Sequence, residues 1–269
     1  MTSNSRPEYA VIGAPRQGYD VGMISNRWML PALCAVTAWA QAPGQAGIAH
    51  VAFRVADLEK TRAFYNQLGL EQFFAMKQGE RTTEAFLKIN DHQFIELYPR
   101  TDASQPLGLM HVCYESNDLQ ALHAQMVKRG LAVSDVRKAG AGNLLLTMKD
   151  PAGNTIEYTQ YMPGSRHYED RGKHLGADRI STRLAGVTMV TSDAGALRKF
   201  YADKLGISAP ELEIEPPGSD AHTGIQFPVA DLNQAAAALA RRELPVESGV
   251  SRVMVTDPDG IVVSFVKAP

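Results

Sequence analysis

Four stretches of the chain begin with the same alternation of apolar and polar residues and end in an aspartate seven positions later. They are HVAFRVAD at 50–57, HVCYESND at 111–118, GVTMVTSD at 186–193 and GIQFPVAD at 224–231. A period of two is the pattern of a strand with one buried face, and an aspartate after it is a preferred helix N-cap. The sequence therefore predicts four repeated units, each opening with a strand and a helix.

The residues that follow each aspartate continue the repeat. Apolar residues at helical spacing run to a glycine in AFYNQLGL at 63–70, and KFYADKLGI at 199–207 repeats this ending in the third unit. Two strands joined by a polar turn are predicted in TTEAFLKINDHQFIELYP at 82–99, and two joined by the DPAG turn in NLLLTMKDPAGNTIEYTQY at 143–161. Each unit is thus a strand, a helix and two or three further strands, so the fold class is α+β.

Composition and charge favour a globular protein that acts on small molecules. A chain of 269 residues with 45% hydrophobic residues is long enough for one large domain or two of ordinary size. Its 27 basic and 29 acidic residues are intermixed, so no large positive field exists to attract nucleic acid or an anionic membrane. We expect a small-molecule substrate, no nucleic-acid partner, and either a monomer or a homodimer.

The N-terminal part of the chain is expected to lie outside the folded protein. Residues 1–22 are rich in glycine, proline and polar residues and are predicted to be a non-native or disordered extension. In residues 23–42, Arg27 precedes an apolar run that ends in Ala-Trp-Ala at Ala40, a secretory signal pattern too short to span a bilayer. Residues 23–40 therefore predict export to the periplasm or the medium, with no integral membrane segment after cleavage. A buried N-terminal helix is the alternative.

Two histidines and two glutamates occupy matching places in the first two units. His50 and His111 open the first strand of their units, while Glu96 and Glu157 lie in closing strands that are otherwise largely apolar. Burying a glutamate is costly unless a charged partner or a metal compensates it. Two imidazoles and two carboxylates suit one divalent ion (Fe²⁺, Ni²⁺, Mn²⁺, Co²⁺ or Zn²⁺), with positions left for water or substrate. Buried His–Glu hydrogen bonds without a metal are the alternative.

Four more residues are candidates for substrate binding. Strand periodicity places Arg54, Tyr98 and Tyr161 on the faces that carry the histidines and glutamates, and Asn143 lies on a neighbouring strand. Arginine and tyrosine side chains there are suited to a substrate carboxylate or carbonyl. The alternative is that these residues only line the rim of the sheet.

Together these features resemble the vicinal oxygen chelate superfamily, which includes glyoxalase I, methylmalonyl-CoA epimerase, extradiol dioxygenases and the fosfomycin- and bleomycin-resistance proteins. The resemblance rests on the four module openings, the AFYNQLGL helix end, FIELYP, and the closing turns DPAGNTIE and DPDGIVVS. It implies paired βαβββ modules of the glyoxalase/dioxygenase fold, four in all, forming two domains with curved sheets around a divalent metal. We expect a metal-binding domain at 47–161, a linker at 162–182 and a degenerate domain at 183–267.

The resemblance also implies the ligand set His50, Glu96, His111 and Glu157, which is the glyoxalase type. Extradiol dioxygenases are similar only in part, since they use two histidines and one glutamate and leave the first closing strand out. A fourth ligand at Glu96 favours isomerase, lyase or epimerase chemistry on a small oxygen-chelating substrate, in which Glu157 or Glu96 detaches to carry a proton. The alternatives are an Fe²⁺-dependent dioxygenase of extradiol type or another oxygen-activating enzyme, and a small-molecule binding or resistance protein without catalysis.

The third and fourth units depart from this pattern. Gly186 and Gly224 stand at the histidine positions, Ser264 stands at the closing glutamate position, and the third unit is too short for a full set of strands. Glu213 precedes a proline by three residues, as Glu96 does, but no other ligand accompanies it. We expect a metal-free module that serves packing, dimer formation or coverage of the first site.

The predicted linker at 162–182 contains a group of basic residues and histidines, which are Arg166, His167, Arg171, Lys173 and His174. A solvated connector is the simpler interpretation, because connecting segments usually run over the surface. The alternative is a cationic flap over the metal site.

Overall fold

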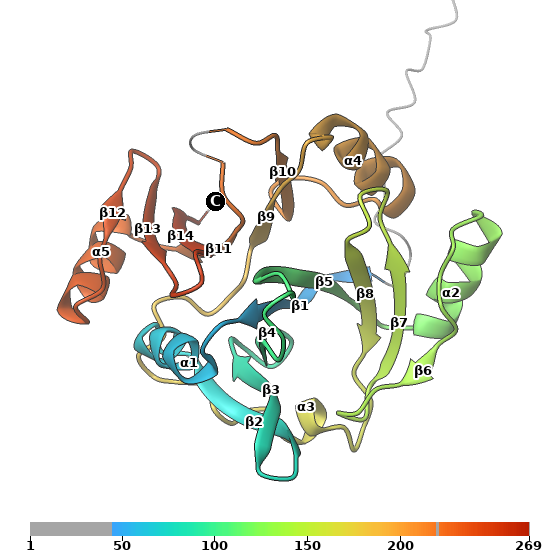
Figure 1. The fold of residues 1–269 in the computed structure, drawn as a ribbon, viewed down its shortest axis with the longest axis horizontal. Helices are drawn as coiled ribbons and strands as arrows, with labels where there is room; N and C mark the ends of the chain where they lie inside the picture. Colours follow the sequence, from blue (N-terminus) through green and yellow to red (C-terminus); the bar gives the residue numbers. More distant parts are fainter. Residues whose placement is uncertain (1–44, 219–220, 269) are drawn as a thin grey trace, which may run out of the picture. The chain divides into compact units, whose positions relative to one another are not determined.

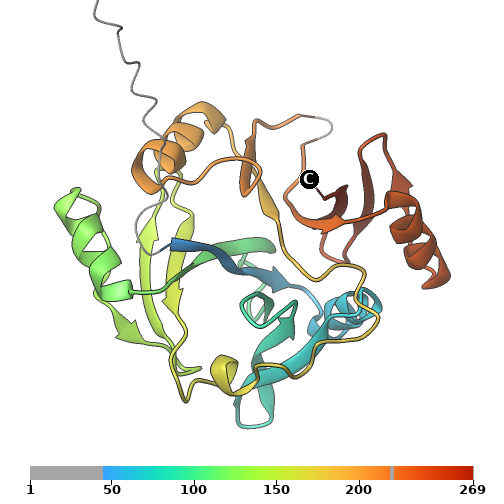
Figure 2. The ribbon, with the colours of Figure 1, turned by 180° about the vertical axis from the view of Figure 1, so that it is seen from behind.

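The computed structural model describes residues 45–218 and 221–268, which form two β-sheets with a small number of helices (Figures 1 and 2). The predicted extension at 1–22 and the signal-like segment at 23–42 lie outside the described residues. Among the helices that are described, none is long and apolar enough to cross a membrane.

The first two units build the first sheet. In chain order its elements are β1 (Gln45–Val55), α1 (Leu58–Gln67), β2 (Glu71–Gln78), β3 (Arg81–Lys88), β4 (Phe94–Pro99), β5 (Gly108–Ser116), α2 (Leu119–Lys128), β6 (Arg137–Lys138), β7 (Leu144–Lys149) and β8 (Thr155–Gln160). The eight strands lie in the order β2-β3-β4-β1-β5-β8-β7-β6. Within each unit the first strand pairs in parallel with the last, and β1 and β5 pair antiparallel at the centre. The sheet is therefore two βαβββ modules side by side, as predicted.

The last two units build the second sheet. In the chain, α3 (Arg166–Glu169) follows the last strand of the first sheet. The remaining elements are β9 (Gly186–Val190), α4 (Ala194–Phe200) with a π-helical turn at Tyr201–Leu205, β10 (Leu212–Glu215), β11 (Gly224–Val229), α5 (Leu232–Arg241), β12 (Glu247–Ser248), β13 (Arg252–Thr256) and β14 (Val262–Lys267). Its strand order is β10-β9-β11-β14-β13-β12. The third unit contributes only two strands, because its chain is as short as the sequence indicated. Two sheets fit two domains, and the proposed domain boundaries stay a prediction.

Each long helix begins at the aspartate that the repeat predicted. The side chains of Asp57, Asp118, Asp193 and Asp231 all accept hydrogen bonds from backbone N–H groups in the first turn of the following helix. These N–H groups have no partner within the helix, so an aspartate at this position stabilises the helix start. The predicted N-caps are confirmed in all four units.

One buried hydrogen bond occurs twice, once in each direction between the two halves of the chain. The Tyr65 hydroxyl donates to Asp257 Oδ2 at 3.2 Å, and the Tyr201 hydroxyl donates to Asp150 Oδ2 at 3.1 Å. Each tyrosine lies at the helix end shared by the first and third units, and each aspartate begins a closing DPxG turn. The repeated helix ends and the repeated turns therefore hold each other across the two halves.

Two glycines allow strands of the second sheet to approach each other closely. A Cβ atom at Gly224 would lie 2.5 Å from the carbonyl oxygen of Val262, and one at Gly186 would lie 2.2 Å from that of Pro210. Real Cβ atoms do not approach backbone oxygens this closely, so the two positions require glycine. These are the positions at which the first two units carry histidine.

Replacing Gly224 with alanine is expected to lower the free energy of unfolding by about 2 kcal/mol, because the strands must move apart to admit the methyl group. Gly195→Ala is the matched control, since nothing lies within 4 Å of its added Cβ and alanine is the better helix former. Chemical denaturation of both variants checks the prediction. Equal stability of the two variants would contradict it.

Candidate metal centre

The four predicted metal ligands lie on four adjacent strands at the middle of the first sheet. Glu96 is on β4, His50 on β1, His111 on β5 and Glu157 on β8. Side chains alternate between the two faces of a strand, and the register of the central strands brings all four onto one face. Sequence periodicity gave each strand its face, and strand pairing brings the faces together.

Two rows of three residues in cross-strand register form the floor of the site: Glu96–Ala52–His111 and His50–Cys113–Glu157. Each row places a small residue between a histidine and a glutamate. Ala52 and Cys113 are fully buried, and they leave the space above them to the longer side chains on either side. The two rows run in opposite directions, as expected when one module is repeated about a two-fold axis.

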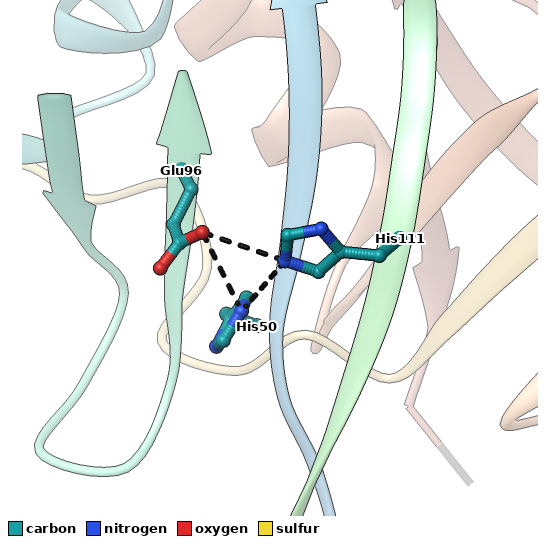
Figure 3. Close-up of side chains that lie close together, drawn as sticks. All are labelled: His50, Glu96 and His111. Atoms are coloured by element: carbon teal, nitrogen blue, oxygen red, sulfur yellow. Dashed lines mark hydrogen bonds and ion pairs between the residues drawn. The ribbon is translucent and has the colours of Figure 1, made fainter. Parts of the chain in front are cut away.

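The donor atoms of His50, Glu96 and His111 converge on one point (Figure 3). His50 Nε2 lies 3.1 Å from His111 Nε2, and Glu96 Oε2 lies 3.6 and 3.4 Å from these two nitrogens. Glu157 Oε2 lies 3.7 and 3.4 Å from the same nitrogens. Two donors that each bind one ion at about 2.1 Å are about 3.0 Å apart at right angles and about 3.4 Å apart in a tetrahedron. The distances from each glutamate to the two histidines therefore suit ligands of one divalent metal ion, and His50, Glu96 and His111 have donor atoms within 4.8 Å of one another.

Burial and mutual attraction set the charges of these groups. Burial acts to raise the pKa of Glu96, but the charge of His50 and the hydrogen bond with His111 outweigh it and bring this pKa to about 2. Burial also opposes ionisation of Glu157, and again the two histidines leave its pKa lowered. For His111, burial favours the neutral form, yet the hydrogen bond to Glu96 and the charge of Glu157 raise its pKa. Without a metal, the two carboxylates thus favour the protonated form of His111.

A cavity of about 200 Å³ opens beside the ligands and is walled by apolar side chains such as Met76, Phe86 and Phe94. A larger cavity of about 910 Å³, near His92 and Glu211, contains none of the four ligands. The smaller cavity is the one that adjoins the donor atoms, so it is the candidate substrate site.

The four predicted substrate-binding residues divide into two pairs. Tyr98 and Asn143 line the cavity, and the Tyr98 hydroxyl donates to Glu96 Oε2 at 2.9 Å. Arg54 instead donates to the carbonyl of Pro106 at 3.1 Å, and Tyr161 donates to the carbonyl of His92 at 2.8 Å. Neither Arg54 nor Tyr161 is among the residues that line the cavity, and the substrate-binding role of all four stays a prediction.

Two residues that line the cavity were not among the predicted site residues. Glu84 on β3 lines the cavity, and burial and the charge of Glu96 raise its pKa against a lowering hydrogen bond with Tyr98. Its signal was present, because Glu84 alternates with Phe86, the cross-strand partner of Glu96. The second residue is His167, which the sequence indicated only as one member of a possible flap, because no periodic pattern in the connecting segment assigns it a face.

The segment at 162–182 matches neither of its two interpretations in full. Arg166, Arg171 and Lys173 are exposed, as a solvated connector requires, whereas His167 and Asp170 are buried. Of its residues only His167 lines the cavity. The segment contributes one imidazole to the cavity and leaves Arg166, Arg171 and Lys173 exposed.

The second sheet repeats the two rows with different residues: Glu213–Thr188–Gly224 and Gly186–Gln226–Ser264. Glu213 thus occupies the position of Glu96. Both glutamates precede a proline by three residues in the sequence. Gln226 replaces the small Cys113, and its Nε2 donates to Glu213 Oε2 at 2.7 Å and contacts Thr188 at 3.3 Å. The Gln226 amide thus gives Glu213 a hydrogen-bond donor, whereas in the first sheet a metal ion would be the partner of Glu96.

Comparison with known proteins agrees with this architecture. Residues 47–158 match the model of the Glyoxalase/Bleomycin resistance protein/Dioxygenase superfamily. Curated protein sequences give no match.

Solved structures with a similar fold include both dioxygenases and a glyoxalase. The 2,3-dioxygenase LapB from Pseudomonas sp. KL28 aligns with a TM-score of 0.65 at 15% identity, covering 84% of this chain and 93% of that one. The Mn(II)-bound glyoxalase from Novosphingobium aromaticivorans aligns with a TM-score of 0.65 at 15% identity, covering 84% and 83%. Homoprotocatechuate 2,3-dioxygenase from Arthrobacter globiformis aligns with a TM-score of 0.61 at 18% identity, covering 85% and 81%. At these identities the similarity establishes the fold, and residues 47–158 are the part of the chain that matches the Glyoxalase/Bleomycin resistance protein/Dioxygenase superfamily.

Proposed function

We propose that this protein is a metal-dependent isomerase, lyase or epimerase that binds a small substrate through two adjacent oxygens. The observation that carries the proposal is the position of Glu96, whose Oε2 lies 3.6 Å from His50 Nε2 and 3.4 Å from His111 Nε2. With Glu157 this makes four protein donors. A six-coordinate ion held by four donors keeps two positions free, which suits a substrate with two adjacent oxygens.

The bound ion would act as a Lewis acid that stabilises negative charge on the substrate oxygens. The proton is carried by the chain's own carboxylates. Glu96 is held in place by the Tyr98 hydroxyl at 2.9 Å, whereas the polar contacts of Glu157 among the described residues are with the two histidines. Glu157 is therefore the carboxylate freer to leave the ion and take a proton from a substrate carbon.

An Fe²⁺-dependent dioxygenase is the second candidate, and the Tyr98–Glu96 hydrogen bond favours it. If this bond keeps Glu96 away from the ion, the remaining ligands are His50, His111 and Glu157. Two histidines and one carboxylate with three open positions are typical of non-haem Fe²⁺ oxygenases. Three open positions accommodate a bidentate diol and O₂ together.

Metal analysis of matched variants tests which donor set operates. The full chain, purified without chelator and loaded with each candidate ion, is compared with Glu96→Gln and with Glu213→Gln, the equivalent change in the second sheet. We expect about one equivalent of metal in the parent and in Glu213→Gln, and at least tenfold weaker binding in Glu96→Gln, because a charged ligand is lost. Unchanged affinity in Glu96→Gln would contradict the four-ligand site and favour the dioxygenase.

Assays of the loaded protein distinguish the reactions. Small α-hydroxy ketones in D₂O are followed by NMR for deuterium at the hydroxyl-bearing carbon beside the carbonyl, and O₂ consumption is measured with catechols on the Fe²⁺ form. The proposal expects deuterium incorporation that Glu157→Gln abolishes, without O₂ consumption. O₂ consumption with catechols would establish the second candidate. Saturable ligand binding with no product in either assay would leave a small-molecule binding protein.

Metal affinity is expected to rise with pH, because the ion displaces the proton held at His111. The pKa of His111 is raised above its ordinary value of 6.5, so below that value each bound ion must release a proton. We expect affinity to increase as pH rises through the folded pKa of His111 and to level off above it. Calorimetric titrations in buffers of different ionisation enthalpy measure the released proton. Affinity that does not change with pH from 5.5 to 8 would contradict this prediction.

The stability of the metal-free protein, unlike its metal affinity, is expected to fall as pH rises through the folded pKa of His111. Lowered pKa values of Glu96 and Glu157 stabilise the fold above their unfolded value of 4.5, and this contribution is lost as pH falls through their folded pKa values, about 2 in the case of Glu96. The raised pKa of His111 stabilises the fold below its unfolded value of 6.5, and this contribution is lost as pH rises through the folded pKa. The site therefore stabilises the metal-free chain most between pH 4.5 and 6.5. Thermal melts with and without metal check this window.

A further inference from the structure

The segment that carries His167 is fastened to the first sheet at several points. Lys88 on β3 is buried and pairs with Asp170 at 2.8 Å and with Asp91 at 2.9 Å. At the other end of α3, the Arg166 N–H donates to the carbonyl of Ala141 at 2.9 Å. Figures 1 and 2 both show α3, in yellow, between the β2–β3 hairpin and the loop that precedes β7. His167 is therefore held at a defined place where the two edges of the curved sheet face each other.

A chain of hydrogen bonds determines which nitrogen of His167 carries the proton. The backbone N–H of Met162 donates to Asn143 Oδ1 at 3.3 Å, and this identifies the oxygen end of the Asn143 amide. The other end, Nδ2, is only a donor, and it lies 2.9 Å from His167 Nδ1. Nδ1 is therefore the acceptor, and the proton of the neutral imidazole is on Nε2.

The Nε2–H group has no hydrogen-bond partner among the described residues, although it is buried. The imidazole is 6% exposed and lines the same cavity as His50, Glu96 and Glu157. Burial, followed by the charge of His50, lowers the pKa of His167 to about 3, so the ring is neutral at physiological pH. A buried donor without an acceptor is costly unless a ligand supplies one.

Aromatic rings surround the imidazole, namely those of Phe73, Phe74, Phe86, Phe94 and Tyr161. Phe94 lies between the two histidines, with ring centroids 4.5 Å from His50 and 4.4 Å from His167. His50 and His167 thus pack against the same ring, and both line the same cavity. A substrate that fills this cavity therefore lies near both residues.

We infer that His167 is a substrate-binding residue, whose Nε2–H donates to an oxygen at the end of the substrate remote from the metal. This inference rests on the proposed function, because the substrate's other end is taken to bind the ion. It assigns the substrate to a chemical class: two adjacent oxygens at one end, an apolar middle that lies against Phe86 and Phe94, and a carbonyl or similar acceptor at the other end. Asn143 is a positioning residue, since it acts by fixing the tautomer of His167.

The tautomer is tested first, and this test needs no ligand. The Zn²⁺-loaded full chain, labelled with ¹⁵N-histidine, is examined by long-range ¹H–¹⁵N correlation at neutral pH, with His167→Phe identifying the signals. We expect the Nε2–H tautomer in the parent and the Nδ1–H tautomer in Asn143→Asp, because a carboxylate accepts where the amide donates. The Nδ1–H form in the parent would overturn the inference.

Binding is tested with hydroxamates, which chelate metals through two adjacent oxygens. The probes are benzohydroxamate and its 3-acetyl and 4-acetyl derivatives, titrated into the parent, His167→Phe and Asn143→Asp. An acetyl derivative is expected to bind the parent about tenfold more tightly than benzohydroxamate, and to lose this advantage in both variants. His167→Phe keeps the aromatic volume and Asn143→Asp keeps the amide's shape, so thermal melts close to the parent's are expected for both.

The outcomes separate this inference from the function on which it rests. Equal binding of all three probes to the parent, or an advantage that survives in both variants, would overturn the role of His167 while leaving the metal site intact. No binding of benzohydroxamate to the metal-loaded parent would instead count against the proposed function. Rescue of the advantage in His167→Gln, which restores a donor, would support the inference further.

Discussion

The burial of two carboxylates and two imidazoles on one face of a sheet is the constraint on which the rest of this structure depends. Each group alone is costly to remove from water, and the four together are tolerated because every donor atom has an oppositely charged or metal-binding neighbour within 3.7 Å. The convergence requires the central antiparallel pair of β1 and β5, with the closing strand of each module beside it. It also requires the small floor residues Ala52 and Cys113, because a larger side chain would occupy the metal's space.

The second sheet meets the same constraint without a metal. Its strand register is equivalent, and Glu213 occupies the position of Glu96. The side chain of Gln226 fills the central space, and its hydrogen bond to Glu213 compensates the burial of that carboxylate. Gly224 then lets a neighbouring backbone carbonyl approach to where a histidine side chain would begin. Metal binding there would require the strands to separate as well as the introduction of histidine and glutamate ligands. One repeated architecture thus supports a charged site in one sheet and an amide-filled one in the other.

A segment outside the repeat forms part of the wall of the cavity beside the four candidate ligands. The buried Lys88–Asp170 pair fastens the connecting segment to β3, and three residues before Asp170 the chain places His167 among aromatic rings at the cavity. Apolar rings around a neutral imidazole exclude water and keep a hydrogen-bond donor available, which favours recognition of a substrate by shape and one polar contact. The sheet therefore supplies the chemistry of the site, whereas the connecting segment supplies part of its selectivity.

Local pattern was sufficient to predict much of this protein. Period-two alternation and the recurring aspartates predicted the strands, the helix starts and the four units, and matching positions in the repeat singled out His50, Glu96, His111 and Glu157. These signals are local, because side-chain direction and helix capping depend on neighbours in the sequence. Arg54 and Tyr161 share a strand face with the ligands yet contact Pro106 and His92, because a face does not specify how far along a curved sheet a side chain reaches. Only the tertiary structure placed Glu84 and His167 at the cavity and showed that Gln226 is the hydrogen-bond partner of Glu213 in the second sheet. Each of these features depends on strand register and on contacts between residues far apart in the sequence.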